Sequence, residues 1–244
     1  DMAEVRRRPA RVLSAGLLLA LGLALGGAGP AGAAEEAQAA GLYDRPVLVV
    51  DPGVHTAPIN RLDADREGRF LVTASDDKTV RVWAAEDGRL LRTLRLPAGP
   101  GDVGKAYAAA ISPDGALVAA GGWALSRDHD VYLFDRASGR LLRRVGGLPN
   151  VVLHLAFSPD GARLAATIWG GKGVRLIDPA AGRVVAADEG YGDRSYGAAF
   201  DAAGRLATTS WDGKVRLYDP GLGLLRAAKA PGGRRRIPER GATG

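Results

Sequence analysis

Cysteine is absent from this sequence of 244 residues, and aromatic residues make up only 6% of it. The absence of cysteine excludes disulfide bonds, a lipid-attachment cysteine and a thiol nucleophile, so packing alone must stabilise the fold. Long apolar runs are also rare, because 35 glycines and 14 prolines divide the chain into short segments. Hydrophobic residues nevertheless make up 46%, which is enough for a core. Short apolar segments between tight turns are typical of an all-β protein.

The one long apolar run lies at residues 12–27. Several arginines precede it and the small residues Ala31-Gly32-Ala33 follow it, which is the order of a secretory signal peptide. Because the run is shorter than the roughly 20 residues that cross a bilayer, cleavage is favoured over an uncleaved membrane anchor. The sequence therefore predicts a signal peptide over residues 1–33 and a flexible linker over residues 34–44. It predicts an exported protein, periplasmic or extracellular, with no stable membrane insertion after cleavage.

The formal net charge of +6 is concentrated at the two ends of the chain. Residues 1–33 carry +2 and residues 226–244 carry +5, which leaves −1 for the remainder. A nearly neutral folded part offers no basic face to a nucleic acid. The charge therefore does not predict a nucleic-acid partner.

Four segments of the chain repeat one pattern of strands and turns. Gly68, Gly115, Gly161 and Gly204 mark the first turn of each unit and are 47, 46 and 43 residues apart. In two units this turn reads Ser-Pro-Asp-Gly, in which proline suits the second position of a type I turn and glycine the fourth. Repeated four-strand units of about 40 to 45 residues predict an all-β propeller of four-stranded antiparallel blades, about four of them present. The predicted repeats within residues 45–230 cover about 55–97, 101–149, 150–190 and 191–230.

The details of these units resemble the WD-repeat β-propellers, and the resemblance covers most of the chain. The segment SDDKTVRVW ends in Trp83 at the position of the family's Trp-Asp pair, although an alanine follows it here. Val54-His55 stands at the position of the family's Gly-His. Later units keep the aspartate of the pair and relax the aromatic residue, as in Tyr218-Asp219.

The resemblance implies a structural hydrogen-bonded tetrad in the first unit, consisting of His55, Ser75, Asp77 and Trp83. In this tetrad the indole donates to Ser75, the serine to His55, and the imidazole to Asp77. A catalytic role for the same histidine, aspartate and serine is the minor alternative. The fourth unit retains part of the set, as Ser210, Asp212 and Tyr218.

A bacterial subgroup of exported WD-repeat proteins is the most similar part of the family, and some of its members carry a caspase-like peptidase domain beside the propeller. This chain has no cysteine to act as such a nucleophile. Family propellers usually have more than four blades, and residues 231–244 form a basic, irregular tail. We expect either a C-terminally truncated, open propeller or four blades followed by a solvated tail. The exposed edges of an open propeller favour self-association.

Three tryptophans occupy the same position in successive units, seven or eight residues after the turn glycine. In a propeller this position is the end of the second strand, so the indoles should lie on one rim. Exposed aromatic residues on a rigid scaffold are typical of protein or peptide binding. The alternatives are indoles that cover the seam between blades, and a carbohydrate or small-ligand platform. The predicted partner-binding residues are Trp123, Trp169, Trp211, Tyr107, His154, Tyr196 and Arg127, the last in an insertion within the second unit.

Catalytic and cofactor motifs are weak. Ser75-Asp76-Asp77-Lys78 fits the pattern S-x-x-K but lies in a strand turn rather than at a helix start. The adjacent Asp128-His129-Asp130 is a poor metal site, because neighbouring residues on one loop rarely complete a coordination sphere. We therefore expect no catalytic residue, metal or cofactor, and a non-catalytic scaffold for a protein or peptide partner. One alternative is a propeller enzyme of the lactonase or quinoprotein type, which needs several carboxylates or histidines in the central channel. The other is the propeller portion of a larger protein with a caspase-like peptidase domain.

Overall fold

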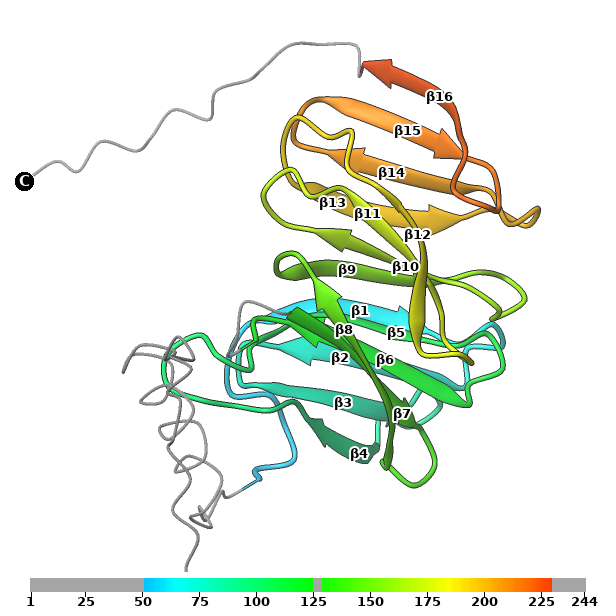
Figure 1. Ribbon diagram of the computed structural model, residues 1–244. Coiled ribbons are helices and arrows are strands. Elements are labelled where there is room, and N and C mark those ends of the chain that lie inside the picture. The colour runs from blue at the N-terminus through cyan, green and yellow to red at the C-terminus, as the bar shows by residue number, and fades with distance from the viewer. Residues whose placement is uncertain (1–50, 125–128, 230–244) are drawn as a thin grey trace, which may run out of the picture. The chain divides into compact units, whose positions relative to one another are not determined.

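The computed structural model describes residues 51–124 and 129–229, which form four antiparallel sheets of four strands each (Figure 1). The first sheet contains β1 (Ile59–Ala64), β2 (Phe70–Ser75), β3 (Thr79–Ala84) and β4 (Leu90–Arg95). The second contains β5 (Ala106–Ile111), β6 (Leu117–Gly122), β7 (His129–Asp135) and β8 (Leu141–Leu148). The third contains β9 (Val152–Phe157), β10 (Leu164–Ile168), β11 (Val174–Asp178) and β12 (Arg183–Asp188). The fourth contains β13 (Ser195–Phe200), β14 (Leu206–Ser210), β15 (Lys214–Tyr218) and β16 (Leu224–Lys229).

Each sheet is a meander in which the strands pair in chain order. The turn from β5 to β6 is the predicted Ser-Pro-Asp-Gly turn. The N–H of Gly115 donates to the carbonyl of Ser112 at 2.8 Å, and the carboxylate of Asp114 accepts the N–H of Ala116 at 3.0 Å. Gly115 has a φ of +72°, a left-handed conformation that glycine adopts without steric cost.

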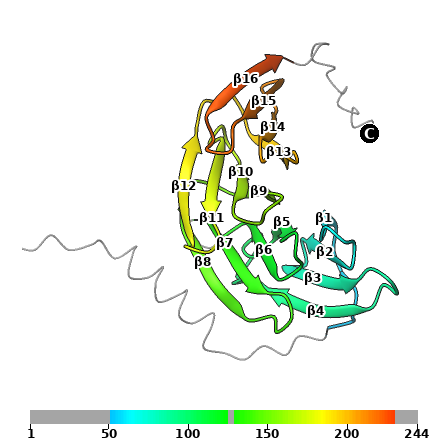
Figure 2. The same ribbon diagram turned by 90° about the vertical axis from the view of Figure 1, so that its right-hand side faces the viewer.

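The sheets follow one another with their first strands on the inner side and their fourth strands on the outer side (Figure 2). Successive first strands contact each other: β1 contacts β5, β5 contacts β9, and β9 contacts β13. The small residues of β5, AYAAAI, suit this close approach of neighbouring sheets. The inner strands therefore define the central side of the propeller fold.

The core consists of three clusters, one in each gap between neighbouring sheets. In the first cluster Val72 and Val80 pack against residues of the second sheet such as Val118, and all three are fully buried. Side chains alternate between the two faces of a strand, so Thr73 and Arg81 point to the opposite face of the first sheet. That opposite face carries the polar network described below.

The predicted fold class is confirmed, because the described residues form four four-stranded antiparallel sheets, as expected for propeller blades. The predicted signal peptide (1–33), linker (34–44) and basic tail (231–244) lie outside the described residues, as does Arg127. In the described parts of the chain we find no helix with the length and apolar character that a membrane span requires.

Candidate functional site: an arginine–aromatic strip and the networks that support it

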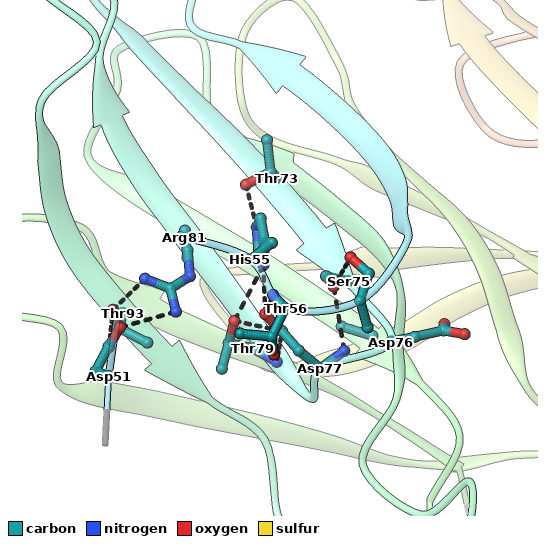
Figure 3. A network of polar contacts seen from close by, with 12 residues as sticks. Asp51, His55, Thr56, Thr73, Ser75, Asp76, Asp77, Thr79, Arg81 and Thr93 are labelled. Carbon is teal, nitrogen blue, oxygen red and sulfur yellow. Dashed lines mark hydrogen bonds and ion pairs between the residues drawn. The ribbon is translucent and has the colours of Figure 1, made fainter. Parts of the chain in front are cut away.

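A chain of hydrogen bonds connects Trp83 to Asp77 in the first sheet. Figure 3 shows its part from Thr73 through His55 to Asp77. The indole Nε1 of Trp83 donates to Oγ1 of Thr73 at 2.8 Å, and the same hydroxyl lies 2.7 Å from Nε2 of His55. The Nδ1 of His55 lies 2.8 Å from Oδ2 of Asp77. One consistent assignment has His55 donating from Nδ1 to the carboxylate and accepting the Thr73 hydroxyl at Nε2. With this assignment, each side-chain nitrogen of Trp83 and His55 has a hydrogen-bond partner.

The structure differs from the expected tetrad at one residue, because Thr73 takes the place expected for Ser75. Trp83 pairs across the sheet with Leu71, so Thr73 is its diagonal neighbour and Ser75 lies two residues farther along β2. At about 3.3 Å per residue, that extra distance is beyond the reach of the indole N–H. Ser75 instead donates to the carbonyl of Ala57 at 3.1 Å and accepts the N–H of Asp77 at 3.1 Å.

Several hydrogen bonds hold Asp77 in its charged form. Burial alone would raise the pKa of its carboxyl, but hydrogen bonds from Thr79 and His55 outweigh burial and lower the pKa below its ordinary value. The hydroxyl of Thr79 donates to Oδ1 at 2.6 Å, and the N–H of Thr56 donates to Oδ2 at 3.1 Å. Asp77 thereby fixes the segment before β1 against the β2–β3 turn.

A second contact attaches the same segment to the third and fourth strands. The buried guanidinium of Arg81 lies 2.9 Å from Asp51, whose other carboxylate oxygen accepts the hydroxyl of Thr93 at 2.9 Å. Hydrogen bonds from the N–H of Gly53, from Thr93 and from Arg81 lower the pKa of Asp51 to about 2. The sequence analysis missed this pair, although a Val-Arg dipeptide recurs in three units as Val80-Arg81, Val174-Arg175 and Val215-Arg216.

The fourth sheet contains a corresponding hydrogen-bonded network, at the equivalent positions of its strands, in which tyrosines take part. Thr208 pairs with Arg216 as Thr73 pairs with Arg81. The hydroxyl of Tyr191 lies 2.6 Å from Oγ1 of Thr208 and 2.8 Å from the hydroxyl of the fully buried Tyr218. Burial, with hydrogen bonds to Tyr191 and Asp188, raises the pKa of Tyr218 far above its ordinary value.

Of the three residues expected to retain the tetrad in this unit, only Tyr218 enters the tyrosine network. Asp212 instead forms a buried ion pair with Arg216 at 2.6 Å, and its N–H donates to Ser210 at 3.2 Å. Tyr191, which the sequence analysis missed, lies outside the strands and carries no motif signal. The hydroxyl of Tyr191 thus connects the segment before β13 to β14 and β15 of the fourth sheet.

An arginine lies between two exposed tryptophans in the third and fourth sheets. The Cζ of Arg194 lies 4.3 Å from the ring centroid of Trp169 and 3.6 Å from that of Trp211. These indoles are 41% and 60% exposed. The ring of Tyr196, 45% exposed, lies 6.4 Å from that of Trp211, and the Cζ of Arg61 lies 4.9 Å from the tyrosine ring. We call these five residues the arginine–aromatic strip.

Backbone contacts between the two sheets position the strip. Trp169 follows β10, Trp211 follows β14, and Arg194 immediately precedes β13. The N–H of Trp211 donates to the carbonyl of Arg194 at 3.0 Å. The buried hydroxyl of Ser195 accepts the N–H of Ile168 at 3.0 Å and also contacts the carbonyl of Gly173. The residues on either side of the guanidinium are therefore fixed to the two strand ends that carry the tryptophans.

Arg61 extends the strip to the first sheet. Its Nε and one terminal nitrogen donate to the carbonyl of Leu153 in β9, at 3.3 and 3.2 Å. The same terminal nitrogen donates to the carbonyl of Tyr196 in β13 at 3.2 Å. One arginine on β1 thus connects the inner strands of the first, third and fourth sheets.

Three other predicted partner-binding residues have described positions but are not part of the strip, namely Trp123, Tyr107 and His154. Trp123 is 41% exposed and packs edge-on against His129, with ring centroids 6.4 Å apart. Tyr107 is half-buried, and burial raises its pKa. His154 accepts the N–H of Ala198 at Nδ1, 3.0 Å away, and burial together with the charge of Arg61 lowers its pKa to about 4. His154 is therefore a neutral residue that joins β9 to β13.

A cavity of about 310 Å³ lies at the inner strands, next to His154. Its titratable lining residues are Asp63, Arg66 and His154. Burial raises the pKa of Asp63, whose carboxylate accepts the N–H of Ile111 at 2.9 Å. Among the residues with described positions, no group of three or more histidine or acidic side chains is arranged to hold a metal.

Comparison with known proteins identifies repeats of the WD40 type. The profile described as "WD domain, G-beta repeat" matches residues 49–84, 88–135 and 189–219. Similar curated proteins include subunit I of eukaryotic translation initiation factor 3 from Aspergillus fumigatus, 29% identical over 153 residues, which are 63% of this chain and 39% of the relative. The subunit from Coccidioides immitis is 29% identical over 61% of this chain and 38% of its own length. The chain thus spans about two fifths of the length of these relatives.

These relatives correct the prediction about location. They are translation initiation factor subunits of fungi, which contradicts the predicted exported, periplasmic or extracellular protein. The bacterial exported subgroup is likewise not supported, whereas the resemblance to WD-repeat proteins is. The predicted location rested on an arginine-rich segment before an apolar run, whereas the similarity lies in the repeats.

Proposed function

Because the chain carries WD40 repeats, we propose that it is a non-catalytic scaffold that binds a protein or peptide partner on the arginine–aromatic strip. The observation that carries this proposal is the guanidinium of Arg194 held between the exposed indoles of Trp169 and Trp211. Tryptophan, tyrosine and arginine are the residues that dominate binding energy at protein interfaces. All five residues of the strip are of these three kinds.

The strip is also organised before a partner arrives. Each ring in it contacts a neighbouring ring or guanidinium, and Ser195 fixes the backbone beside Arg194. Side chains that are already ordered lose little rotamer entropy on binding, which otherwise costs about 0.5–1.5 kcal/mol for each immobilised side chain. A preformed, exposed aromatic surface is therefore suited to association with another protein.

Two further observations favour a scaffold over a propeller enzyme. The inner cavity contains one carboxylate and one histidine, and the pKa of that histidine is lowered to about 4, so the imidazole is neutral at pH 7. The similar fungal proteins are named as subunits of an initiation factor, that is, as members of an assembly. By analogy we infer that a protein is the partner of this chain.

Selection from a displayed random-peptide library tests the proposal on the full chain. The Trp169→Ser/Trp211→Ser double variant serves in counter-selection, and far-UV circular dichroism verifies that it folds. We expect enriched peptides that bind the wild-type chain at least about tenfold more tightly than the double variant, as for removal of interface hot spots. Trp123→Ser is the matched control, because Trp123 is as exposed as Trp169 but packs on His129. Failure to enrich peptides, or equal binding to the double variant, would refute the proposal.

A further inference from the structure

The charge on Arg194 has no carboxylate partner among the residues with described positions. In the parts of the chain that the structure describes, no side chain accepts a hydrogen bond from its guanidinium, and its Nε is buried without a partner. The three buried third-strand arginines differ in this respect, because each has a carboxylate: Arg81 has Asp51, Arg175 has Glu189, and Arg216 has Asp212.

The nearby acidic residues are engaged elsewhere. Asp193 accepts the backbone N–H of Arg194 at 2.6 Å rather than its guanidinium. Asp212 accepts the N–H of Gly192 at 3.1 Å in addition to its ion pair with Arg216. The immediate surroundings of Arg194 therefore leave its charge to an external group.

The geometry of the two indoles defines what that group can be. The rings of Trp169 and Trp211 lie against the guanidinium and its Nε is buried, so the terminal N–H groups form the edge that a ligand can reach. A carboxylate matches that edge with two parallel hydrogen bonds, and stacking of the guanidinium keeps the edge in place. Beside it, the rings of Trp211 and Tyr196 offer apolar surface to neighbouring side chains.

Arg61 adds a second positive charge at the far end of the strip. It donates to two backbone carbonyls and forms no ion pair with a described residue. Two arginines without carboxylate partners, separated by the ring of Tyr196, make the strip locally positive. The strip is positive although residues 34–225, between the two charged ends of the chain, carry a net charge of −1.

We propose that the strip binds an acidic segment of a protein partner, with an aspartate or glutamate carboxylate on the in-plane N–H groups of Arg194. This inference rests on the proposed function and specifies the chemistry of the partner. A nucleic acid fits less well, because its affinity depends on many phosphate contacts and the strip supplies two guanidinium groups. Binding to RNA is therefore an outcome that would contradict the proposal.

Three synthetic peptides of one pattern test the acidic requirement on the full chain. Each has an acetylated N-terminus, an amidated C-terminus, and two leucines among glycines, and the remaining positions are all Glu, all Gln or all Lys. Isothermal titration calorimetry at low salt gives the affinities, since screening weakens exposed charge pairs. We expect the Glu peptide to bind about tenfold or more tightly than the Gln peptide, as for a desolvated charge pair, and the Lys peptide not to bind.

Variants of Arg194 locate the effect. Arg194→Gln should remove the preference for Glu over Gln, and Arg194→Lys should retain a small part of it, because lysine keeps the charge but not the planar pair of donors. Arg205→Gln is the control, because that exposed arginine of the fourth sheet pairs with Asp201. The preference should be unchanged in this control.

Each alternative result has a definite meaning. Equal affinity for the Glu and Gln peptides, or a preference that survives Arg194→Gln, would overturn the inference. So would a mixed-sequence single-stranded RNA that binds more tightly than the Glu peptide in an Arg194-dependent manner. If library-selected peptides are neutral or basic yet depend on Trp211, the scaffold proposal stands and the acidic partner is wrong. If no peptide depends on Trp211, the scaffold proposal itself fails.

Discussion

The indole of Trp83 donates its hydrogen to the hydroxyl of Thr73, 2.8 Å away, and that hydroxyl also contacts His55. Thr73 is thus the central member of the network, with one neighbour on β3 and another in the segment before β1. A single hydroxyl satisfies two buried nitrogen atoms. The first sheet therefore depends on a threonine that no motif highlights.

Thr73→Val should destabilise the chain more than Ser75→Ala. The valine has nearly the same shape but leaves the indole N–H and the imidazole Nε2 without partners, a cost of about 1–3 kcal/mol for each buried group. Ser75→Ala removes hydrogen bonds to backbone atoms only, at about 0.5–1.5 kcal/mol each. Urea unfolding monitored by tryptophan fluorescence measures both free energies of unfolding. A larger loss for Ser75→Ala would show that the serine is the central residue after all.

The lowered carboxyl pKa values of Asp51 and Asp77 make stability fall in acid. An unfolded aspartate has a pKa of 3.8, whereas Asp51 in the folded chain has a pKa of about 2, so the unfolded state binds more protons between these values. Stability from these groups is complete above the unfolded pKa and is lost as pH falls through the folded pKa. The urea midpoint should be level near neutral pH and should decline below about pH 4.

Asp51→Asn should flatten that decline, and the exposed Asp102→Asn is the control. Asparagine cannot titrate, so the part of the acid slope contributed by Asp51 disappears in the first variant. The comparison uses urea midpoints at several pH values. An acid slope that Asp102→Asn flattens as much as Asp51→Asn would contradict this assignment.

Tyr218→Phe should lower the free energy of unfolding by about 1–3 kcal/mol, the cost of buried polar groups that lose a partner. The phenol donates to Asp188 at 2.7 Å and contacts Tyr191, and its side chain is fully buried. Tyr196→Phe is the matched control, because Tyr196 is 45% exposed. Thermal unfolding measures the stability of both variants. An equal loss of stability in Tyr218→Phe and Tyr196→Phe would refute this account.

Gly173→Ala should be much more destabilising than Gly213→Ala. Both glycines have positive φ angles, +68° and +79°, so both alanines incur the backbone strain of about 1–2 kcal/mol. A methyl group at Gly173 would lie 1.9 Å from the carbonyl oxygen of Asp188, whereas one at Gly213 has open space. Because the carbonyl of Gly173 also contacts Ser195, the first variant should weaken binding at the strip as well. Equal free energies of unfolding would contradict the steric explanation.

The fold was predictable because its signals are local. The glycines that end turns, such as Gly115, and the alternation of residues along β3 are fixed by nearest neighbours in the sequence. The resemblance to WD-repeat proteins also predicted that His55, Asp77 and Trp83 belong to one hydrogen-bonded network, and the structure connects them. The choice between Thr73 and Ser75 was harder, because both residues face the same side of β2 and only the register decides between them.

The strip was predictable only in part. Trp169, Trp211 and Tyr196 recur at fixed positions of the repeat, but Arg194 and Arg61 carry no such signal. The position of the guanidinium between two indoles depends on how the third and fourth sheets pack, through Ser195 and Ile168. His154, expected at the rim, is partly buried and joins β9 to β13 instead. Such contacts arise from packing between sheets, which a repeat pattern does not encode.

The account is tested most directly by the affinity of one library-selected peptide for Trp211→Ser and for Trp123→Ser. We predict a loss of about tenfold or more for Trp211→Ser and almost none for Trp123→Ser, because hot-spot residues dominate binding while neighbouring exposed residues contribute little. Equal losses in the two variants, or no loss in either, would contradict the claim that the arginine–aromatic strip binds the partner.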